Sequence, residues 1–319
     1  MMSGFSSEWL ALREAVDHRS LNATLKSKVE TFFANCLVSV DQPLKVLDLG
    51  CGSGSNLRAL AGFLPDFQHW TLVDHDLELL TAARQTLSQW GGTAPWGGTE
   101  EAMQPSLDLS SASILTSGHA QSGPEPLLIK YAGKTIQIEF SQVDLDLSIE
   151  CLLERPFDLV TAAAFFDLVS EKWIKRFSEN LKTSFYTTLV YNGREQWLPQ
   201  IEVDKEVLRA FHQDQTRDKG FGIAAGPQAT QRLMEHLQAN QFLCDCALSP
   251  WVLDGLADHS LIERLSSGSL EAVRRTRSVS ESVLEKWSNR NRNLTRCTIG
   301  HWDLWAYQNK APDLSLIHI

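Results

Sequence analysis

Apolar residues along the middle of the chain alternate between short continuous runs and helically spaced stripes. The runs predict buried strands, and the stripes predict amphipathic helices. The predicted strands are 45–49, 69–73, 135–143, 157–162 and 185–191. The predicted helices between them are 56–64, 76–90, 147–153 and 165–181. Strands and helices that alternate at this spacing predict a mostly parallel α/β sheet with helices on both faces.

Segments outside this alternation predict how the rest of the chain is organised. Residues 1–42 hold two predicted helices, which we expect to pack on a main domain of residues 43–311. Segment 91–126 is rich in Gly, Ser, Thr and Pro, which predicts a flexible insertion. A hairpin that turns at Ala132-Gly133 should follow it.

Beyond Arg194 the alternation lapses, and the segment of about 200–292 predicts a helical cap. The predicted elements in and after the cap are helices at 204–213, 229–239 and 256–291, the last broken at Gly268, and strands at 242–248 and 296–307. The apolar tail 312–319 follows the last strand, and we assign it no role.

Composition narrows the class of protein. With 319 residues and 43% hydrophobic positions, the chain can bury the core of one large α/β domain. A formal charge of −10 repels phosphate backbones, so nucleic acid is a disfavoured partner. The six cysteines follow no zinc-binding spacing, so we expect no metal. The start of the chain lacks the features of a secretory leader, and no apolar run reaches the ~18 residues of a membrane span. We therefore expect a cytoplasmic protein without a membrane partner, and the oligomeric state stays open.

One stretch of the cap carries many basic residues, interleaved with Glu271, Glu281 and Glu285. The basic residues are Arg264, Arg274, Arg275, Arg277, Lys286, Arg290, Arg292 and Arg296. Two interpretations stay open: a charged helical surface, or a cap that recognises an anionic ligand.

A glycine-rich turn, Asp48-Leu49-Gly50-Cys51-Gly52-Ser53-Gly54, links the first predicted strand of the sheet to its helix. Glycines permit positive φ and let the backbone approach a ligand closely. A dinucleotide fingerprint has the spacing G-x-G-x-x-G, whereas these glycines are spaced G-x-G-x-G. The preceding Asp48 suits a ligand with an ammonium group and would repel a pyrophosphate. Asp74 ends the next strand, where doubly wound sheets contact ribose hydroxyls.

Four segments together resemble the class I S-adenosylmethionine-dependent methyltransferases, in a form similar to bacterial members of that family. Val46 to Gly54 resembles the first motif of that family, and Val73-Asp74 resembles the second. Val143-Asp144-Leu145 is similar to the position after the third strand, and Phe157 to Ala162 is similar to the fourth-strand motif. The resemblance covers about 45–191 in family order. It implies a Rossmann-like, seven-stranded fold whose last strand is antiparallel, methyltransferase activity, and S-adenosyl-L-methionine as cofactor.

The resemblance also implies roles for particular residues. The turn residues would surround the methionine part, Asp74 would hold the ribose, Asp144 would border adenine, and Ala162 would lie beneath the sulfonium. The full implied cofactor set is Asp48, Gly50, Cys51, Gly52, Ser53, Gly54, Asn56, Asp74, His75, Asp144, Leu145, Ala162 and Ala163. For Asp144 the alternative is a helix-capping side chain.

Catalytic residues are harder to predict, because the sulfonium activates its own methyl group and the protein mainly aligns an acceptor. The sequence after the fourth strand lacks the Asn/Asp-Pro-Pro box of enzymes that methylate base or amide nitrogens. It also lacks the Pro-Cys nucleophile of cytosine-C5 enzymes. Position and chemistry leave three candidates: His212 as general base, Asp167 and Tyr191.

These observations favour methyl transfer to an oxygen or nitrogen atom of a small molecule. Alternatives remain open: an RNA or protein methyltransferase, a non-catalytic S-adenosylmethionine-binding protein, or an aminopropyl transferase with the same fold. The sequence does not identify the acceptor.

Overall fold

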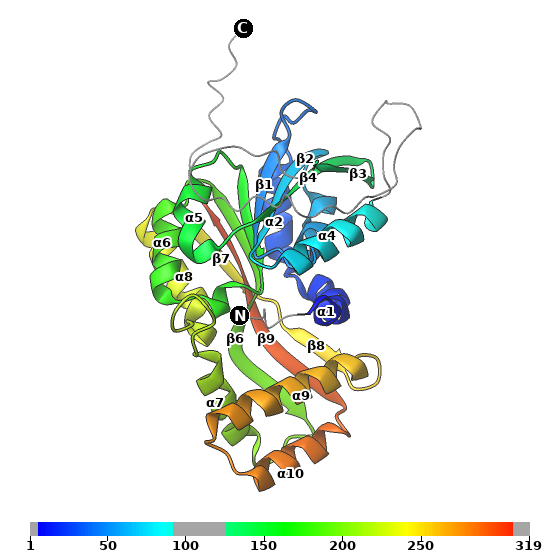
Figure 1. Ribbon diagram of the computed structural model, residues 1–319, viewed down its shortest axis with the longest axis vertical. Coiled ribbons are helices and arrows are strands. Elements are labelled where there is room, and N and C mark those ends of the chain that lie inside the picture. The colour runs from blue at the N-terminus through cyan, green and yellow to red at the C-terminus, as the bar shows by residue number, and fades with distance from the viewer. Residues whose placement is uncertain (1–5, 92–124, 309–319) are drawn as a thin grey trace. The chain divides into compact units, whose positions relative to one another are not determined.

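The computed structural model describes residues 6–91 and 125–308. The chain divides into two compact units. Figure 1 labels most of the helices and strands of both. Unit 1 comprises Met1–Arg19 and Ser27–Ala163, and unit 2 comprises Ser20–Lys26 and Ala164–Ile319.

Unit 1 is built on a sheet with parallel strands at its centre. Its strands are β1 (Leu44–Leu49), β2 (Phe67–Asp74), β3 (Leu127–Tyr131), β4 (Lys134–Gln142) and β5 (Leu159–Ala163). Its helices are α1 (Ser7–Ser20), α3 (Ser55–Leu60), α4 (Leu77–Trp90) and α5 (Leu145–Leu153), with a 3-10 turn at Ala61–Phe63. Helix α2 (Ala23–Phe33) begins in unit 2 and ends in unit 1.

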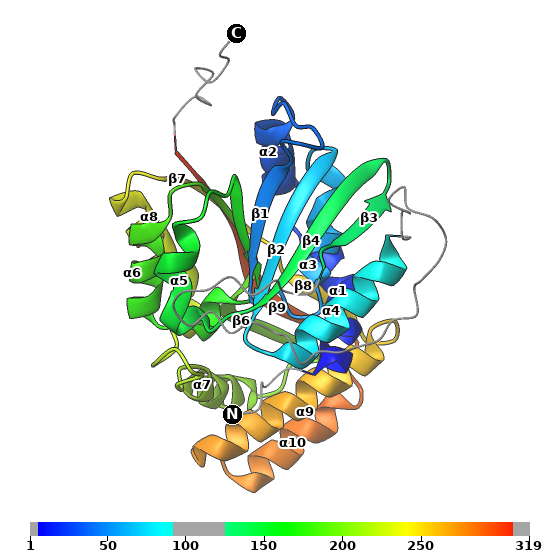
Figure 2. The same cartoon turned by 45° about the horizontal axis from the view of Figure 1, so that its top comes forward.

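The strand order in unit 1 is β3-β4-β2-β1-β5. Figure 2 shows β3, β4, β2 and β1 side by side in this order. Strand β2 pairs in parallel with β1 and β4, β1 pairs in parallel with β5, and β3 forms an antiparallel hairpin with β4. Val46, Leu47 and Leu49 of β1 are fully buried, as expected for a strand covered on both faces. The ends of β1 and β2 therefore meet at one edge of the sheet, where open α/β sheets bind ligands.

Unit 2 holds the remaining described strands and five of the described α-helices. Its strands are β6 (Ser184–Leu198), β7 (Leu243–Leu248), β8 (Trp251–Asp254) and β9 (Arg296–Tyr307). Its helices are α6 (Glu171–Asn180), α7 (Asp204–Gln215), α8 (Ala229–Ala239), α9 (His259–Thr276) and α10 (Glu281–Asn291), with 3-10 turns at Phe166–Leu168 and Gly226–Gln228. Strand β9 is antiparallel to β6, β7 and β8.

A buried carboxylate holds the irregular part of β6. The register of β6 on β9 shifts between Thr187 and Val190, and Leu189 has a positive φ of 56°. Asp303 of β9 accepts hydrogen bonds from the backbone amides of Leu189 (2.9 Å) and Asn22 (2.7 Å). Asp303 is fully buried, so these donors are satisfied inside the protein.

The predicted mixed α/β fold with an antiparallel last strand is confirmed. The described residues contain nine strands, however, and not the seven that the resemblance implies. The two additional strands are β3, which forms the hairpin with β4, and β8, which lies in the predicted helical cap segment, where the only strand predicted was 242–248.

Three element predictions were wrong in detail. The predicted helix 165–181 is divided, because Val169 is extended and Ser170 caps a new helix. Helix α9 continues through Gly268, and the break falls at Arg277, whose φ is 55°. Strand β6 runs to Leu198, well past its predicted end.

Part of the chain lies outside the described residues. This holds for most of the predicted insertion 91–126 and for the tail 312–319. In the two described stretches, no helix is both long and apolar enough to cross a membrane.

Candidate functional site

The turn after β1 has the backbone conformation for which its glycines were singled out. Gly50, Gly52 and Gly54 have φ values of 62°, 52° and 76°. Residues other than glycine rarely adopt this left-handed region. The backbone of the turn therefore favours glycine at these three positions. The amide of Cys51 donates to the carbonyl of Val73 at 3.0 Å, which joins the turn to the end of β2.

Asp74 ties the same two segments together through its side chain. Its Oδ2 accepts from the amide of Gly52 at 2.9 Å, and its Oδ1 accepts from the amide of Asp76 at 3.0 Å. The neighbouring His75 is exposed, and its ring lies 3.3 Å from Asp74 Oδ1. A hydrogen bond to Asp74 raises the pKa of His75 even though partial burial lowers it. Asp74, which is predicted to bind the ribose, therefore also holds the glycine turn in its conformation.

Asp48 is completely buried beneath the turn. Asn56 Nδ2 donates to Asp48 Oδ1 at 2.7 Å and to Thr161 Oγ1 on β5 at 3.1 Å. Within the described part of the chain, no donor lies within hydrogen-bonding distance of Asp48 Oδ2. Burial and, to a smaller extent, the charge of Asp74 raise the pKa of Asp48 to about 7, against the opposing hydrogen bond from Asn56. Asn56 thus positions Asp48, and one carboxylate oxygen of Asp48 lacks a donor.

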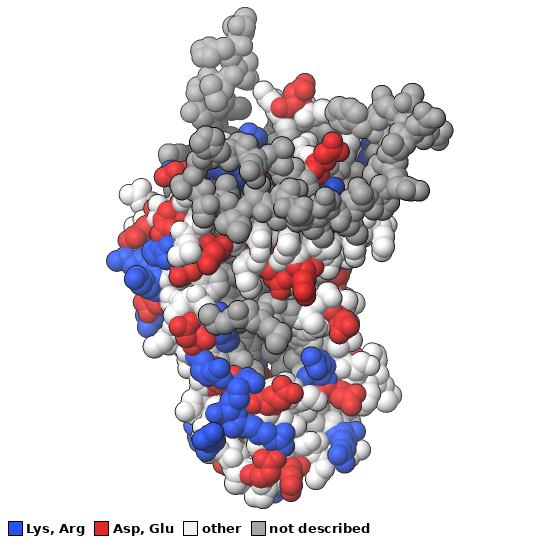
Figure 3. Space-filling view, viewed as in Figure 1, with Lys and Arg blue, Asp and Glu red and all other residues white. Residues whose placement is uncertain are grey.

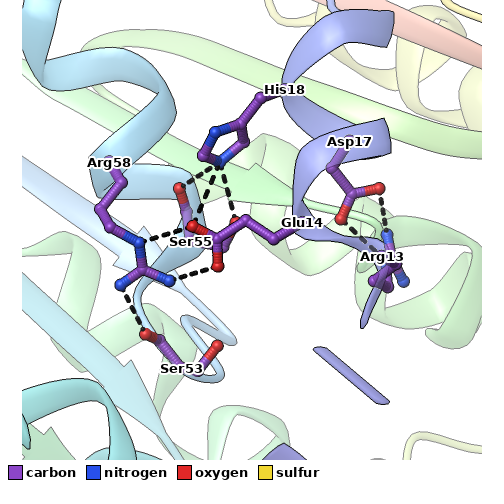
Figure 4. A network of polar contacts seen from close by, with 7 residues as sticks. All are labelled: Arg13, Glu14, Asp17, His18, Ser53, Ser55 and Arg58. Carbon is purple, nitrogen blue, oxygen red and sulfur yellow. Dashed lines mark hydrogen bonds and ion pairs between the residues drawn. The ribbon is translucent and has the colours of Figure 1, made fainter. Parts of the chain in front are cut away.

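Helix α1 is fastened to the turn by a polar network that the sequence did not predict (Figure 4). Arg58 of α3 donates from Nε to Glu14 Oε1 at 2.7 Å, and a second nitrogen of Arg58 donates to the carbonyl of Ser53 at 3.1 Å. His18 Nε2 lies 3.0 Å from Ser55 Oγ. Burial alone would raise the pKa of Glu14, but the bonds and charge of Arg58 lower it overall. The ion pair between Glu14 of α1 and Arg58 of α3 therefore helps to hold the turn in place.

Apolar contacts also close around the glycines. A Cβ atom on Gly52 would lie 2.9 Å from Leu10 Cδ1 of α1, and one on Gly54 would lie 2.9 Å from Leu87 Cδ1 of α4. Any larger residue at these positions would have to displace a neighbour as well as adopt a strained φ.

The other implied cofactor residues fall near this turn or along the same strand ends. Asp144 is exposed and caps α5 by accepting from the amide of Asp146 at 2.9 Å, as the structural alternative predicted. Its charge also contributes to the raised pKa of His75, so Asp144 and Asp74 influence the same side chain. Leu145 and Ala162 are buried, and Ala163 is half-buried at the end of β5.

Two of the three catalytic candidates meet in unit 2. The hydroxyl of Tyr191 lies 3.1 Å from His212 Nε2. The same hydroxyl lies 2.8 Å from Glu195 Oε1, and Trp197 Nε1 donates to Glu195 Oε2 at 2.9 Å. The result is a continuous chain of hydrogen bonds, Trp197–Glu195–Tyr191–His212. Glu195 was missed by the sequence reasoning, because nothing local distinguishes it from a surface glutamate.

Two proton placements satisfy this chain with the same number of protons. In one, Tyr191 donates to an ionised Glu195 and a protonated His212 donates to Tyr191. In the other, a protonated Glu195 donates to Tyr191, which donates to a neutral His212. Burial raises the pKa of Glu195 and lowers the pKa of His212, and both directions favour the neutral placement.

The third candidate, Asp167, lies on the 3-10 turn after β5 and is buried. Its charge adds to the raised pKa of Tyr191, whose main cause is burial. Asp167 also favours the charged form of Lys219, although burial lowers the pKa of that lysine overall. The charge of Asp167 thus acts on the hydrogen-bonded chain through its effect on Tyr191.

Four of the eight basic residues in the cap stretch form ion pairs with acids. Arg274 pairs with Glu281, Arg275 with Asp214, Lys286 with Glu202, and Arg290 with Asp204. Lys and Arg gather over the α7 and α9 part of unit 2 with Asp and Glu beside them (Figure 3). The pairing favours a charged helical surface over an anion-binding cap.

Across residues 6–91 and 125–308, no group of three or more His, Cys, Asp or Glu side chains could hold a metal ion.

Comparisons with known proteins give structural likeness only. No protein-family model matches the chain, and no curated protein matches it. A cyclopropane-fatty-acyl-phospholipid synthase-like protein from Lactobacillus casei is 12% identical, with 96% of each chain covered and a TM-score of 0.46. An S-adenosylmethionine-dependent methyltransferase from Thiobacillus denitrificans, solved with S-adenosyl-L-homocysteine, is 13% identical, with 95% of this chain and 99% of that chain covered and a TM-score of 0.40. Because these TM-scores lie below 0.5, nothing about the ligand of this chain follows from them.

The buried Asp48 makes a prediction about stability. Its folded pKa of about 7 exceeds the usual value, so the folded state holds the proton more tightly than the unfolded state does. The corresponding stability is complete below the unfolded pKa, about 3.9, and is lost as the pH rises through about 7. The variant Asp48→Asn cannot ionise, so it should gain up to about 4 kcal/mol on the wild type between pH 4 and pH 8. Urea unfolding across this pH range measures the difference.

Asp41→Asn, which changes an exposed carboxylate, serves as the matched control and should show no comparable trend. A difference between Asp48→Asn and the wild type that stays constant with pH would show that Asp48 is not held in this environment.

Proposed function

We propose that the chain transfers a methyl group from S-adenosylmethionine to an oxygen or nitrogen atom of a small molecule. The observation that carries the proposal is the turn of three left-handed glycines above Asp48, whose Oδ2 has no donor in the described part of the chain. An amino-acid ammonium is the kind of group that such a carboxylate binds, and glycines leave the backbone open to close approach. A pyrophosphate would be repelled by the same carboxylate.

The residues around the turn fit the remaining parts of this cofactor. Asp74 lies at the end of β2, the position that meets ribose hydroxyls in doubly wound sheets, and Gly52 and Asp76 hold its carboxylate in place. Asp144 and Leu145 follow β4, which is next to β2 in the sheet, and would border the adenine ring. Asn56 would act by positioning Asp48, since both protons of its amide are engaged within the protein.

When bound, the cofactor supplies a methyl group on a positively charged sulfur, which needs no further activation. The residues of the protein then align the acceptor and remove its proton if it carries one. Tyr191 and His212 suit the removal of a proton, because the Tyr191 hydroxyl would accept it from the acceptor while passing its own proton to the neutral His212 Nε2. Glu195 would hold Tyr191 in place from the other side.

A small acceptor fits the charges of the chain better than a nucleic acid does. The formal charge is −10, and four of the eight basic residues in the most basic stretch of unit 2 form ion pairs with acids.

Calorimetric titration with S-adenosylmethionine and with S-adenosylhomocysteine tests the donor. We expect both to bind, and we expect Asp74→Ala to weaken binding about ten- to 150-fold, because each charge-assisted hydrogen bond contributes ~1.5–3 kcal/mol. Asp66→Ala is the matched control, since Asp66 directly precedes the opposite end of β2 and its side chain is 72% exposed. If neither S-adenosylmethionine nor S-adenosylhomocysteine bound, the proposal would be refuted.

A test of the proton relay uses an acceptor found by screening metabolites with labelled donor. We expect His212→Ala to lower kcat ~10²–10⁴-fold with donor affinity unchanged, and Tyr191→Phe to do so while keeping the packing of the ring. Burial lowers the pKa of His212, so kcat of the wild type should rise with pH through a value below the usual 6.5. Unchanged turnover of His212→Ala would remove this residue from the mechanism.

A further inference from the structure

Unit 2 contains a cavity of about 480 Å³, and its lining includes Glu195. It is lined by the end of β6 and by α7, with contributions from Ser269 of α9 and Trp287 of α10. A second cavity of about 130 Å³ shares four of its lining residues: Glu195, Trp197, Phe211 and Ser269. The larger volume is in the range of pockets that bind small organic molecules.

Three aromatic residues contribute to the wall of the larger cavity: Trp197, Phe211 and Trp287. Trp197 and Trp287 contact each other edge to face, with centroids 5.1 Å apart and planes at 69°. Phe211 lines both cavities and lies edge to face with Tyr191 at 6.1 Å. The faces of such rings attract cations, and the attraction grows as the cation is removed from water.

The acidic residues of the lining differ in how they are compensated. Glu202 pairs with Lys286, and Asp204 pairs with Arg290. Glu195 has only neutral donors, Trp197 Nε1 and the Tyr191 hydroxyl, and no cation of the described residues forms an ion pair with it. Lys205, the one lysine of the lining, is exposed at the N-terminal end of α7.

We propose that this cavity binds a small organic cation, with Glu195 as its counter-charge and Trp197, Phe211 and Trp287 as its aromatic wall. The carboxylate and the rings act on the same ligand property, its positive charge, while the cavity is large enough for an organic group of drug-fragment size. Burial raises the pKa of Glu195 when no cation is present, and a cation beside it would favour the ionised form. Binding of such a cation does not depend on the proposed methyl transfer.

The test uses phenyltrimethylammonium, whose charge does not change with pH, and 4-tert-butylphenol as a neutral compound of similar shape. Calorimetric titration of the full chain should show that the cation binds at least about tenfold more tightly than the phenol. Glu195→Gln should weaken the cation about tenfold or more and leave the phenol within about twofold. Glu206→Gln, an exposed acid on the same α7 helix and outside the lining, is the control and should change neither.

A second variant keeps the test decisive if Glu195→Gln does not fold. Phe211→Leu keeps the wall apolar and removes one ring, so it should weaken the cation several-fold more than the phenol. Equal affinities for the cation and the phenol, or equal affinities of wild type and Phe211→Leu for the cation, would overturn the proposal. Binding of S-adenosylmethionine is measured separately, so failure of this test leaves the donor site untouched.

Discussion

The left-handed turn at the end of β1 is the constraint on which the rest of unit 1 depends. Three glycines with positive φ reverse the chain so tightly that the amide of Gly52 reaches the carboxylate of Asp74 at 2.9 Å. The same turn leaves Asp48 buried beneath it, with Asn56 as its one side-chain donor among the described residues. A Cβ on Gly52 or Gly54 would both strain the backbone and press against a leucine, so the turn strongly favours glycine at these two positions.

Burial of ionisable groups is the common physical theme of the two units. In unit 1, burial raises the pKa of Asp48 and leaves one oxygen without a donor in the described part of the chain. In unit 2, burial raises the pKa of Glu195 and lowers the pKa of His212, so the hydrogen-bonded chain between them favours its neutral form. Groups whose pKa values are strongly shifted often lie at functional sites. A charged ligand bound beside such a group can favour the charged form that burial disfavours. In the two proposals, a bound cation supplies the charge partner that Asp48 and Glu195 lack among the described residues.

Patterns of neighbouring residues predicted much of the fold. Helix α8 and strand β9 begin and end where periodicity placed them, since each is bounded by clear polar or turn residues. Strand β6 was predicted too short, because its register shifts between Tyr191 and Glu195 and the alternation of buried and exposed positions is lost there. Gly268 was taken as a break in α9, yet buried residues on both sides of it, such as Ile262 and Val273, outweigh the roughly 1 kcal/mol that glycine costs a helix.

The residues of the proposed donor site were easier to single out from the sequence than the polar chain in unit 2. The local sequence predicts where the strands end, and Asp48, the glycines and Asp74 all lie at such ends. Glu195 became notable only when Tyr191, Trp197 and His212 converged on it in space. The ion pair of Glu14 with Arg58 likewise joins residues 44 positions apart, a separation at which no periodicity reports a contact.

The central claim is that the turn after β1 binds S-adenosylmethionine, and photo-crosslinking tests it most directly. The full chain is irradiated with methyl-labelled S-adenosylmethionine, with and without excess S-adenosylhomocysteine, and the labelled peptides are sequenced. We expect label in peptides from residues 44–74, abolished by the competitor. Label that resists the competitor, or that lies only in peptides of unit 2, would contradict the claim.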